Sequence, residues 1–274
     1  MLLNKSSRST RSTSLFRLSL LVLGFALAVP GGALAATGLA TTSPTVNATA
    51  PAGDFSINLY RKGDFVSQAT PYWCIGASMQ MMLNMVGVTE GDSRDDQERN
   101  MLAARSRWRS SRDSGQGQDT DLAGGALRGA GSSGWARGLV ELGDRYYGQR
   151  AVDGYGAAVR VAAEALRGTD RPVGLIVWRG AHAWVMSGFT ATADPLVDPD
   201  YRITGVYVQD PWYPRVSSIW GPGQDPNSWI SISALKKDFL PRRGGQRHAE
   251  QAGKYVLVLP FDPPRPAVRD RRMI

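Results

Sequence analysis

The residues of this sequence that could carry out nucleophilic chemistry are few. Its 274 residues include one cysteine, Cys74, and two histidines, His182 and His248. A single cysteine cannot form an intrachain disulfide, so its thiol is buried, paired between chains or used as a nucleophile. Because a thiolate attacks carbonyl carbon and a neutral thiol hardly does, a nucleophilic Cys74 needs a base nearby. The composition therefore allows only two cysteine–histidine pairs.

The two histidines lie in different sequence contexts. His182 opens an apolar, β-rich run that continues to Phe189, whereas His248 lies in the polar segment 242–251, which is typical of an exposed loop. A strand holds an imidazole more firmly than a loop does, which favours His182 as the base. The alternative for His182 is a structural role as a core histidine that is bonded to a backbone carbonyl.

Two further residues could complete a reaction centre with Cys74 and His182. Asp210 ends the next predicted strand and could orient the imidazole, although an Asp-Pro pair also commonly marks a turn. Gln68 precedes the cysteine by six positions, and its amide could join the Cys74 backbone N–H in stabilising an oxyanion. Asp210 or Gln68 alone is weak evidence for a catalytic site. The set of Gln68, Cys74, His182 and Asp210 in this order is stronger evidence for one.

The segment that begins at Cys74 has the pattern of a buried helix. Small residues are followed by methionine and leucine at helical spacing, and Gly87 marks the end. The first N–H groups of a helix have no intrahelical partner, and the helix dipole is positive at this end. Both effects stabilise a thiolate, so a cysteine at the helix start suits nucleophilic catalysis.

The remaining patterns predict an α+β fold, with helices mainly in the first part and strands in the second. Alternating apolar residues predict a strand at 55–59, and a loop is expected at about 110–121. The predicted helices cover 94–108, 135–142, 155–167 and part of 228–240, and the later predicted strands cover 172–178, 182–189, 202–210 and 254–260.

The first 35 residues have the features of a bacterial secretory signal peptide. Four basic residues precede an apolar run from Leu18 to Val29, and Ala33-Leu34-Ala35 matches the small-x-small pattern of signal peptidases. The apolar run is shorter than the ~20 residues of a membrane-spanning helix, although a single anchor is the alternative. We therefore expect cleavage before Ala36 and a secreted or periplasmic protein that meets a membrane only during export.

The rest of the chain divides into a linker at 36–53, one domain at 54–262 and a disordered basic tail at 263–274. The formal charge of +8 falls to +4 without the signal peptide, and the basic residues are spread out. This balance predicts no nucleic-acid partner. The sequence leaves the oligomeric state open, and also whether residues 36–53 act as a pro-segment.

No metal or other cofactor is predicted. One cysteine and two histidines cannot fill the usual structural zinc sets, and Asp194, Asp198 and Asp200 lack the glycine and glutamate of a calcium loop. Several tryptophans lie close in sequence to the proposed reaction centre and could bind substrate or pack in the core. Those assigned as candidate substrate contacts are Trp73, Trp178 and Trp212.

The order Gln68, Cys74, His182, Asp210 resembles that of papain-like cysteine peptidases. The segment QATPYWCIGASMQMML is similar to the bacterial branch related to bacteriocin-leader-processing, or double-glycine, peptidases. The resemblance covers roughly residues 55–260. It departs from that branch at Trp73, where leader peptidases usually carry aspartate, and no transporter domain follows.

This resemblance implies a central helix that begins at the cysteine and packs on an antiparallel, β-rich part. It assigns Cys74 as nucleophile, His182 as base, Asp210 as its orienting partner and Gln68 as oxyanion donor. It also places Trp212 like the papain tryptophan that shields the third catalytic residue. The expected function is cleavage of amide bonds in a peptide or protein substrate. An amidase or acyltransferase with the same triad, and a non-catalytic binding module on this scaffold, are the alternatives.

Overall fold

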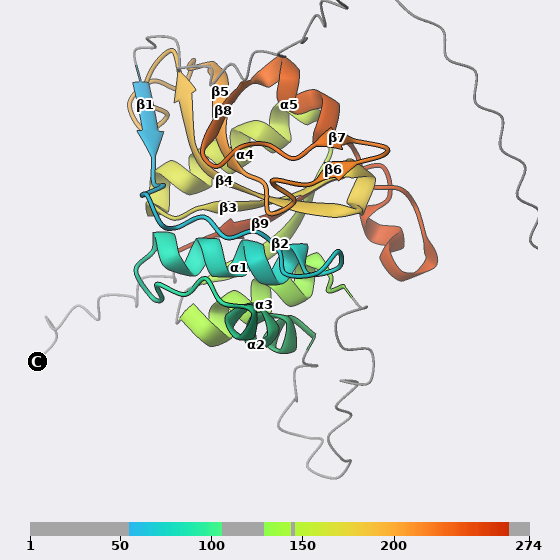
Figure 1. Cartoon of the computed structure of the whole chain (residues 1–274). Coiled ribbons are helices and arrows are strands. Elements are labelled where there is room, and N and C mark those ends of the chain that lie inside the picture. Colours follow the sequence, from blue (N-terminus) through green and yellow to red (C-terminus); the bar gives the residue numbers. More distant parts are fainter. Residues whose placement is uncertain (1–54, 106–128, 144–145, 263–274) are drawn as a thin grey trace, which may run out of the picture. The chain divides into compact units, whose positions relative to one another are not determined.

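The computed structural model describes residues 55–105, 129–143 and 146–262 (Figure 1). The predicted signal peptide, linker, basic tail and the loop at 110–121 lie outside these residues. Among the described helices, none combines the length and apolar character needed to cross a lipid bilayer.

Helices and strands follow the predicted order over most of the described chain, and the predicted α+β class is confirmed. The α-helices are α1 (Cys74–Met85), α2 (Arg94–Arg105), α3 (Ser132–Gly143), α4 (Tyr155–Thr169) and α5 (Ile232–Asp238). Two short 3-10 helices are η2 (Trp178–Gly180) and η3 (Gln246–Gln251). The strands are β1 (Phe55–Asn58), β2 (Tyr147–Val152), β3 (Val173–Val177), β4 (His182–Ala191), β5 (Ile203–Gln209), β6 (Val216–Ser217), β7 (Gly221–Pro222), β8 (Ser228–Ser231) and β9 (Tyr255–Pro260).

Seven of the described strands form one antiparallel sheet. Six of them follow the order β2-β9-β3-β4-β5-β8, and the seventh, β1, pairs with β4. The long strand β4 is its centre: β3 pairs with the first half of β4, β1 with the second half, and β5 runs along the opposite edge. The last strand, β9, inserts between β2 and β3, so the end of the domain is fixed in the middle of the sheet.

Both faces of this sheet are buried by helices. Along β4, Ala183 and Val185 pack in the core shared with α1, α2 and α3, whereas Trp184 and Met186 pack on the opposite side with α4 and α5. This alternation follows from the two-residue period of a strand. Figure 1 shows α1, α2 and α3 together on one side of the sheet and α4 and α5 on the other. All ten residues of β4 are therefore buried, which explains its nearly continuous apolar sequence.

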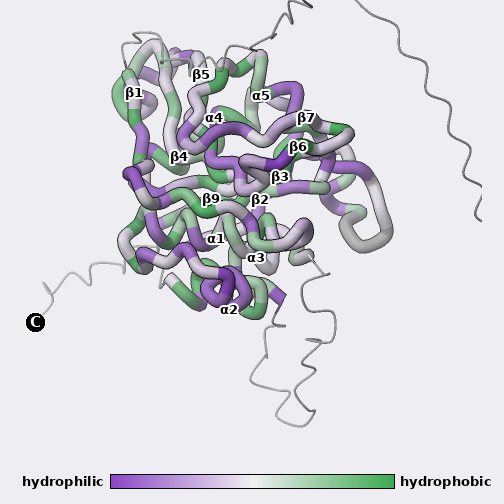
Figure 2. The backbone as a smooth tube through the Cα atoms, viewed as in Figure 1, coloured by the Kyte–Doolittle hydropathy of each residue, from purple (hydrophilic) through white to green (hydrophobic). Residues whose placement is uncertain are grey.

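The helix that begins at Cys74 is enclosed by protein. Every residue of α1 after the cysteine is buried, including Gln80 and Asn84. The hydrogen-bonding groups of these buried side chains have partners. Gln80 Nε2 donates to Asn84 Oδ1 at 2.9 Å and to the neighbouring Thr89 Oγ1 at 2.7 Å. The outer helix α2 carries mostly hydrophilic residues (Figure 2). The surroundings thus fix the position of α1 and of the thiol at its start.

The structure adds a strand at each of two places where the sequence predicted none. The short helix expected within 228–240 is α5, and residues 228–231 before it form strand β8, because their backbone pairs with β5 from Gly205↔Ser231 to Val208↔Ser228. The helix α5 begins only at Ile232, where the Ser231 hydroxyl accepts from the Ala234 N–H. Strand β2 was not predicted; its partner is β9, more than 100 residues later in the sequence.

Candidate active site

Cys74 is the first residue of α1 and the only half-buried residue of that helix. The N-cap position is Trp73, whose carbonyl accepts from the Ala77 N–H at 3.0 Å, and no side chain caps the helix start. The first-turn N–H groups are therefore not used by a capping side chain. Because these groups carry the positive end of the dipole, they stabilise negative charge on or next to the cysteine sulfur.

His182 and Asp210 are brought together by the pairing of β4 with β5. Antiparallel register places Val185 opposite Gln209, so the start of one strand meets the end of the other. His182 Nε2 lies 2.7 Å from Asp210 Oδ1, and both side chains are almost completely buried. The sequence analysis expected the matching ends of these strands to bring the imidazole and the carboxylate within hydrogen-bond reach. The 2.7 Å distance agrees with that expectation.

The other hydrogen bonds of Asp210 determine which nitrogen of the imidazole carries a proton. Asp210 Oδ1 also accepts from the Trp212 backbone N–H at 2.8 Å, and Oδ2 accepts from the Gln224 N–H at 3.0 Å. A backbone N–H can only donate, so both oxygens act as acceptors, as in a carboxylate. His182 Nε2 therefore donates to Asp210, and Nδ1 is the nitrogen left for Cys74.

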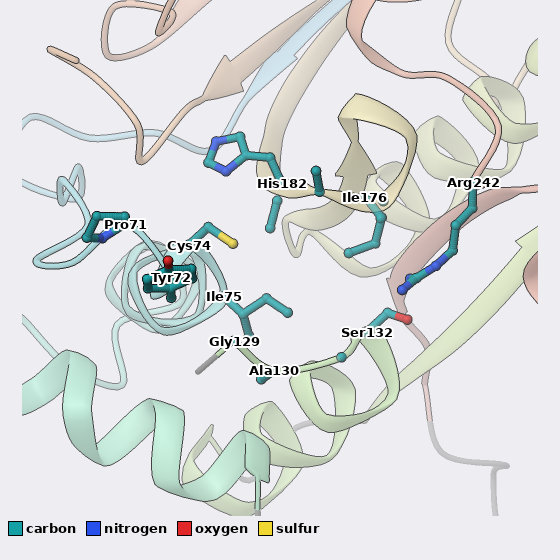
Figure 3. Close-up of a pocket in the computed structure, with 14 residues that line it drawn as sticks. Pro71, Tyr72, Cys74, Ile75, Gly129, Ala130, Ser132, Ile176, His182 and Arg242 are labelled. Carbon is teal, nitrogen blue, oxygen red and sulfur yellow. The ribbon is translucent and has the colours of Figure 1, made fainter. Parts of the chain in front are cut away.

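The environment of His182 favours the charged imidazolium. Burial lowers its pKa, but hydrogen bonds and charge interactions with Asp210 and Cys74 outweigh this effect and raise the pKa to about 9. Figure 3 shows Cys74 and His182 next to each other at one end of the cavity. A charged imidazole in this position would attract a negatively charged sulfur.

Two tryptophans fix the plane of the imidazole. Trp178 stacks on His182 with ring centroids 4.2 Å apart, and Trp212 approaches with its ring nearly perpendicular at 6.2 Å. Trp178 is itself held by a 2.9 Å hydrogen bond from Nε1 to Asp238 Oδ1 and by a second stacked ring, Trp220. Its backbone has a positive φ of 54°, which costs free energy for a bulky residue and is maintained only by its surroundings.

None of the three tryptophans assigned from sequence as substrate contacts lines the cavity that contains the thiol. Trp73 is 1% exposed and packs in the core, with the Arg94 guanidinium over its ring. Trp178 and Trp212 contact the imidazole, as described above. For Trp212, this position agrees with the shielding role that the family resemblance implies. Trp73 and Trp178 are buried and support the site from behind, whereas Trp212 is partly exposed, and its contact with a substrate stays a prediction.

Gln68 lies in the turn before α1 but does not line the cavity. Its Nε2 donates to the Thr70 carbonyl at 2.7 Å, and the same carbonyl accepts from the Trp73 N–H. The segment is tied to the Asp210 turn as well, because the Gln68 N–H donates to Pro211 and the Gln68 carbonyl accepts from Arg215. A carboxamide has two N–H bonds, so the second N–H of Gln68 is not used by this bond, and the buried Gln68 Oε1 has no hydrogen-bond partner among the described residues.

Cys74 and His182 share a cavity of about 210 Å³. This volume is below the roughly 300–1,000 Å³ of typical small-molecule sites, so the cavity fits part of a substrate. Figure 3 shows the thiol on one side of the cavity and Arg242 on the other. The lining residues are Pro71, Tyr72, Cys74, Ile75, Gly129, Ala130, Gly131, Ser132, Ile176, Gly180, Ala181, His182, Ala183 and Arg242.

Sequence reasoning missed the far side of this cavity. Arg242 and Ser132 are separated from Cys74 by 168 and 58 positions, and neither belongs to a motif. His248, the rejected base, lies in η3, and its side chain is outside the described set. Within the described ranges, no group of three or more metal-binding side chains comes together.

A thiol at the start of a buried helix, beside a histidine and an aspartate held by neighbouring antiparallel strands, defines a papain-like cysteine peptidase. Comparison of the sequence with protein families agrees with this class. The chain belongs to the Peptidase_C39-like family, whose sequence model matches residues 61–234.

Solved structures include one of low overall similarity, the crystal structure of UfSP from C. elegans, with 15% sequence identity and a TM-score of 0.44. The alignment covers 80% of this chain and 36% of that chain, so this protein spans little more than a third of its length. A comparison with curated protein sequences gives no significant match.

Proposed function

We propose that this protein is a peptidase that cleaves amide bonds with Cys74 as nucleophile, His182 as general acid and base, Asp210 as orienting carboxylate and Gln68 as oxyanion donor. The observation that carries the proposal is the cavity shared by Cys74 and His182, with His182 Nε2 bonded to Asp210 at 2.7 Å. The family membership supports the same chemistry.

The acylation step follows from the positions of these groups. The Cys74 thiolate attacks the substrate carbonyl, and the oxyanion that forms accepts from the Cys74 backbone N–H and the second N–H of Gln68. The imidazolium of His182, held by Asp210, transfers its Nδ1 proton to the leaving nitrogen as the C–N bond breaks. The product is a thioester on Cys74 and a free amine.

Deacylation uses the same groups in the reverse sense. The neutral imidazole removes a proton from water, and the hydroxide equivalent attacks the thioester carbonyl. Breaking the C–S bond releases a carboxylic acid and restores the thiolate–imidazolium pair. If an amine takes the place of water, the same thioester leads to acyl transfer, which is why the triad alone does not separate a peptidase from a transferase.

A peptide library tests the proposal directly. We expect purified protein to cleave a subset of internal peptide bonds, with new amino and carboxyl termini identified by mass spectrometry. Cleavage of only terminal amides, or transfer to an added amine without hydrolysis, would assign the amidase or acyltransferase alternative. Binding of peptides with no turnover would instead indicate a binding module and contradict the proposal.

We also propose that the protein is bacterial and exported, and that the mature chain begins at Ala36. The support is the basic segment, the short apolar run and the Ala33-Leu34-Ala35 pattern. Amino-terminal sequencing of the protein from the medium or periplasm of an expressing bacterium tests this. Retention of residues 1–35 in the cell membrane would favour an anchor.

Replacing Gln68 with alanine is expected to lower kcat by about 10²–10³-fold, as loss of one oxyanion donor does in other acyl-transfer enzymes. The variant also removes a buried hydrogen bond to the Thr70 carbonyl. Gln68→Glu is a matched control, because it keeps the side-chain length but offers no N–H when ionised. Steady-state kinetics of both variants, with melting curves, measure the effect. Near-normal turnover in Gln68→Ala would remove this residue from the site.

The alkaline limit of activity is expected near the pKa of His182, about 9. Acylation needs the imidazolium, which is retained below this pH and lost as the pH rises through it. The pH dependence of kcat/KM reports the free enzyme and measures this value. Asp210→Asn keeps an oxygen acceptor but removes the charge that raises the pKa, so its alkaline limb should move to lower pH. A wild-type limb at pH 6–7 would contradict the assignment.

A further inference from the structure

Arg242 is the only cationic side chain besides His182 among the described residues that line the cavity, and no aspartate or glutamate lines it. The other lining residues are mostly small or apolar. A guanidinium stays charged at all physiological pH values and presents up to five N–H donors in a plane. Arg242 is half-buried at the cavity wall, and the described lining residues offer it no anionic partner.

The backbone holds Arg242 firmly at this position. Its N–H donates to the Lys254 carbonyl at 2.8 Å, and its carbonyl accepts from the Gly253 N–H at 2.9 Å. The next residue donates to the Arg179 carbonyl at 3.1 Å, which ties the segment to the loop before His182. Arg242 is therefore fixed relative to β9 and to the imidazole.

Gly180 gives the arginine stem access to the cavity. A Cβ at this glycine would lie 3.0 Å from Arg242 Cγ and 3.2 Å from Nε, so a larger residue would displace the stem. The positive φ of 101° at Gly180 also suits glycine. In Figure 3 the Arg242 side chain extends from its segment toward Ser132, across the cavity from Cys74.

The charge of Arg242 is only partly compensated. Burial lowers the pKa of Arg242, whereas the negative charge of Glu250 raises it. Glu250 is exposed and accepts a hydrogen bond from Gln251. Arg242 makes no ion pair within 4.0 Å to any residue of the described chain. A ligand carboxylate would supply the missing charge and accept two parallel N–H bonds.

We propose that Arg242 binds a carboxylate of the substrate, so that the preferred substrates carry an acidic group close to the bond that Cys74 attacks. This inference rests on the proposed hydrolase function and names its substrate class. The carboxylate has two sources in a peptide, an aspartate or glutamate side chain or the free carboxyl terminus. Both present the same chemistry to a guanidinium.

Matched peptide pairs test the proposal. Starting from the best-cleaved library peptide, glutamate and glutamine are placed in turn at each of the two positions on either side of the cleaved bond. A further pair compares a free with an amidated carboxyl terminus. We expect the acidic member of at least one pair to have a kcat/KM about 10- to 100-fold above that of its neutral partner, as for a hydrogen-bonded ion pair. The pair that shows the preference identifies the source of the carboxylate.

Variants assign the preference to Arg242. Arg242→Met should reduce the acidic-to-neutral ratio to within about twofold, and Arg242→Lys should retain part of it. Arg243→Met is the matched control, because Arg243 is exposed, adjacent in sequence and outside the cavity lining, and it should keep the full ratio. A wild-type ratio near one for every pair, or an unchanged ratio in Arg242→Met, would overturn the proposal.

Peptide binding to Cys74→Ala tests the carboxylate site separately from the hydrolase function. If no peptide is cleaved, the hydrolase function fails, yet glutamate and glutamine pairs built on the library peptide that binds Cys74→Ala most tightly can be titrated into Cys74→Ala and into Cys74→Ala/Arg242→Met. Tighter binding of the acidic peptides, lost in the double variant, would support the carboxylate site by itself. Equal binding of acidic and neutral peptides to Cys74→Ala would reject it.

Discussion

Replacement of Cys74 with alanine is expected to abolish peptide cleavage while leaving the fold intact. In a serine protease triad, removal of the nucleophile lowers kcat by about 10⁶, and we expect a loss of that order here. Cys74 is the one half-buried residue of α1, and alanine is a good helix former, so the helix should tolerate the change.

Turnover of the best library peptide, together with melting curves, measures this effect. Peptide binding to Cys74→Ala should persist, because the cavity walls and Arg242 are unchanged. Cleavage at more than about one per cent of the wild-type rate would show that the thiol is not the nucleophile. Loss of activity together with a large drop in melting temperature would assign Cys74 a structural role instead.

Replacement of His182 is expected to cause a loss of similar size, because both proton transfers pass through this imidazole. His182→Ala also leaves the fully buried Asp210 without its side-chain donor and empties the space beside Trp178. The buried carboxylate keeps its backbone donors at Trp212 and Gln224 but loses a charge-assisted hydrogen bond, at a cost of about 1–3 kcal/mol, so this variant should melt at a lower temperature. The structure thus predicts a stability cost in addition to the loss of chemistry.

His182→Gln separates these two effects. Glutamine can still donate an N–H toward Asp210 but cannot act as a base near neutral pH. We expect a melting temperature closer to wild type and the same loss of kcat. His248→Ala is the matched control and should remain active. If His248→Ala were inactive and His182→Gln active, the assignment of the base would be reversed.

The parts of the site that follow from local patterns could be predicted from the sequence. The start of α1 at Cys74 was visible because small residues give way to methionine and leucine at helical spacing up to Gly87. The ends of β4 and β5 were visible as the limits of apolar runs, which is why His182 and Asp210 could be paired. The family resemblance added roles to residues that these patterns had located.

The rest depends on contacts between distant segments. Arg242 reaches the cavity because β9 inserts beside β3 and carries the preceding turn to Gly180, and no local pattern predicts that insertion. Trp178 stacks on the imidazole with a positive φ that sequence reasoning assigns to glycine, not to tryptophan. Residues 228–231 are a strand because β5 offers an unpaired edge, whereas the sequence indicated only the short helix within 228–240.

The rate at which iodoacetamide alkylates Cys74 tests the central claim most directly, because it reports the thiolate without requiring a known substrate. At pH 6, the wild-type thiol should react faster than free cysteine by about tenfold or more, and His182→Gln should remove most of this advantage. The protein offers one site for the reagent, and mass spectrometry can verify the modified residue. A wild-type rate equal to or below that of free cysteine, or one unaffected by His182→Gln, would contradict a thiolate held beside this imidazole.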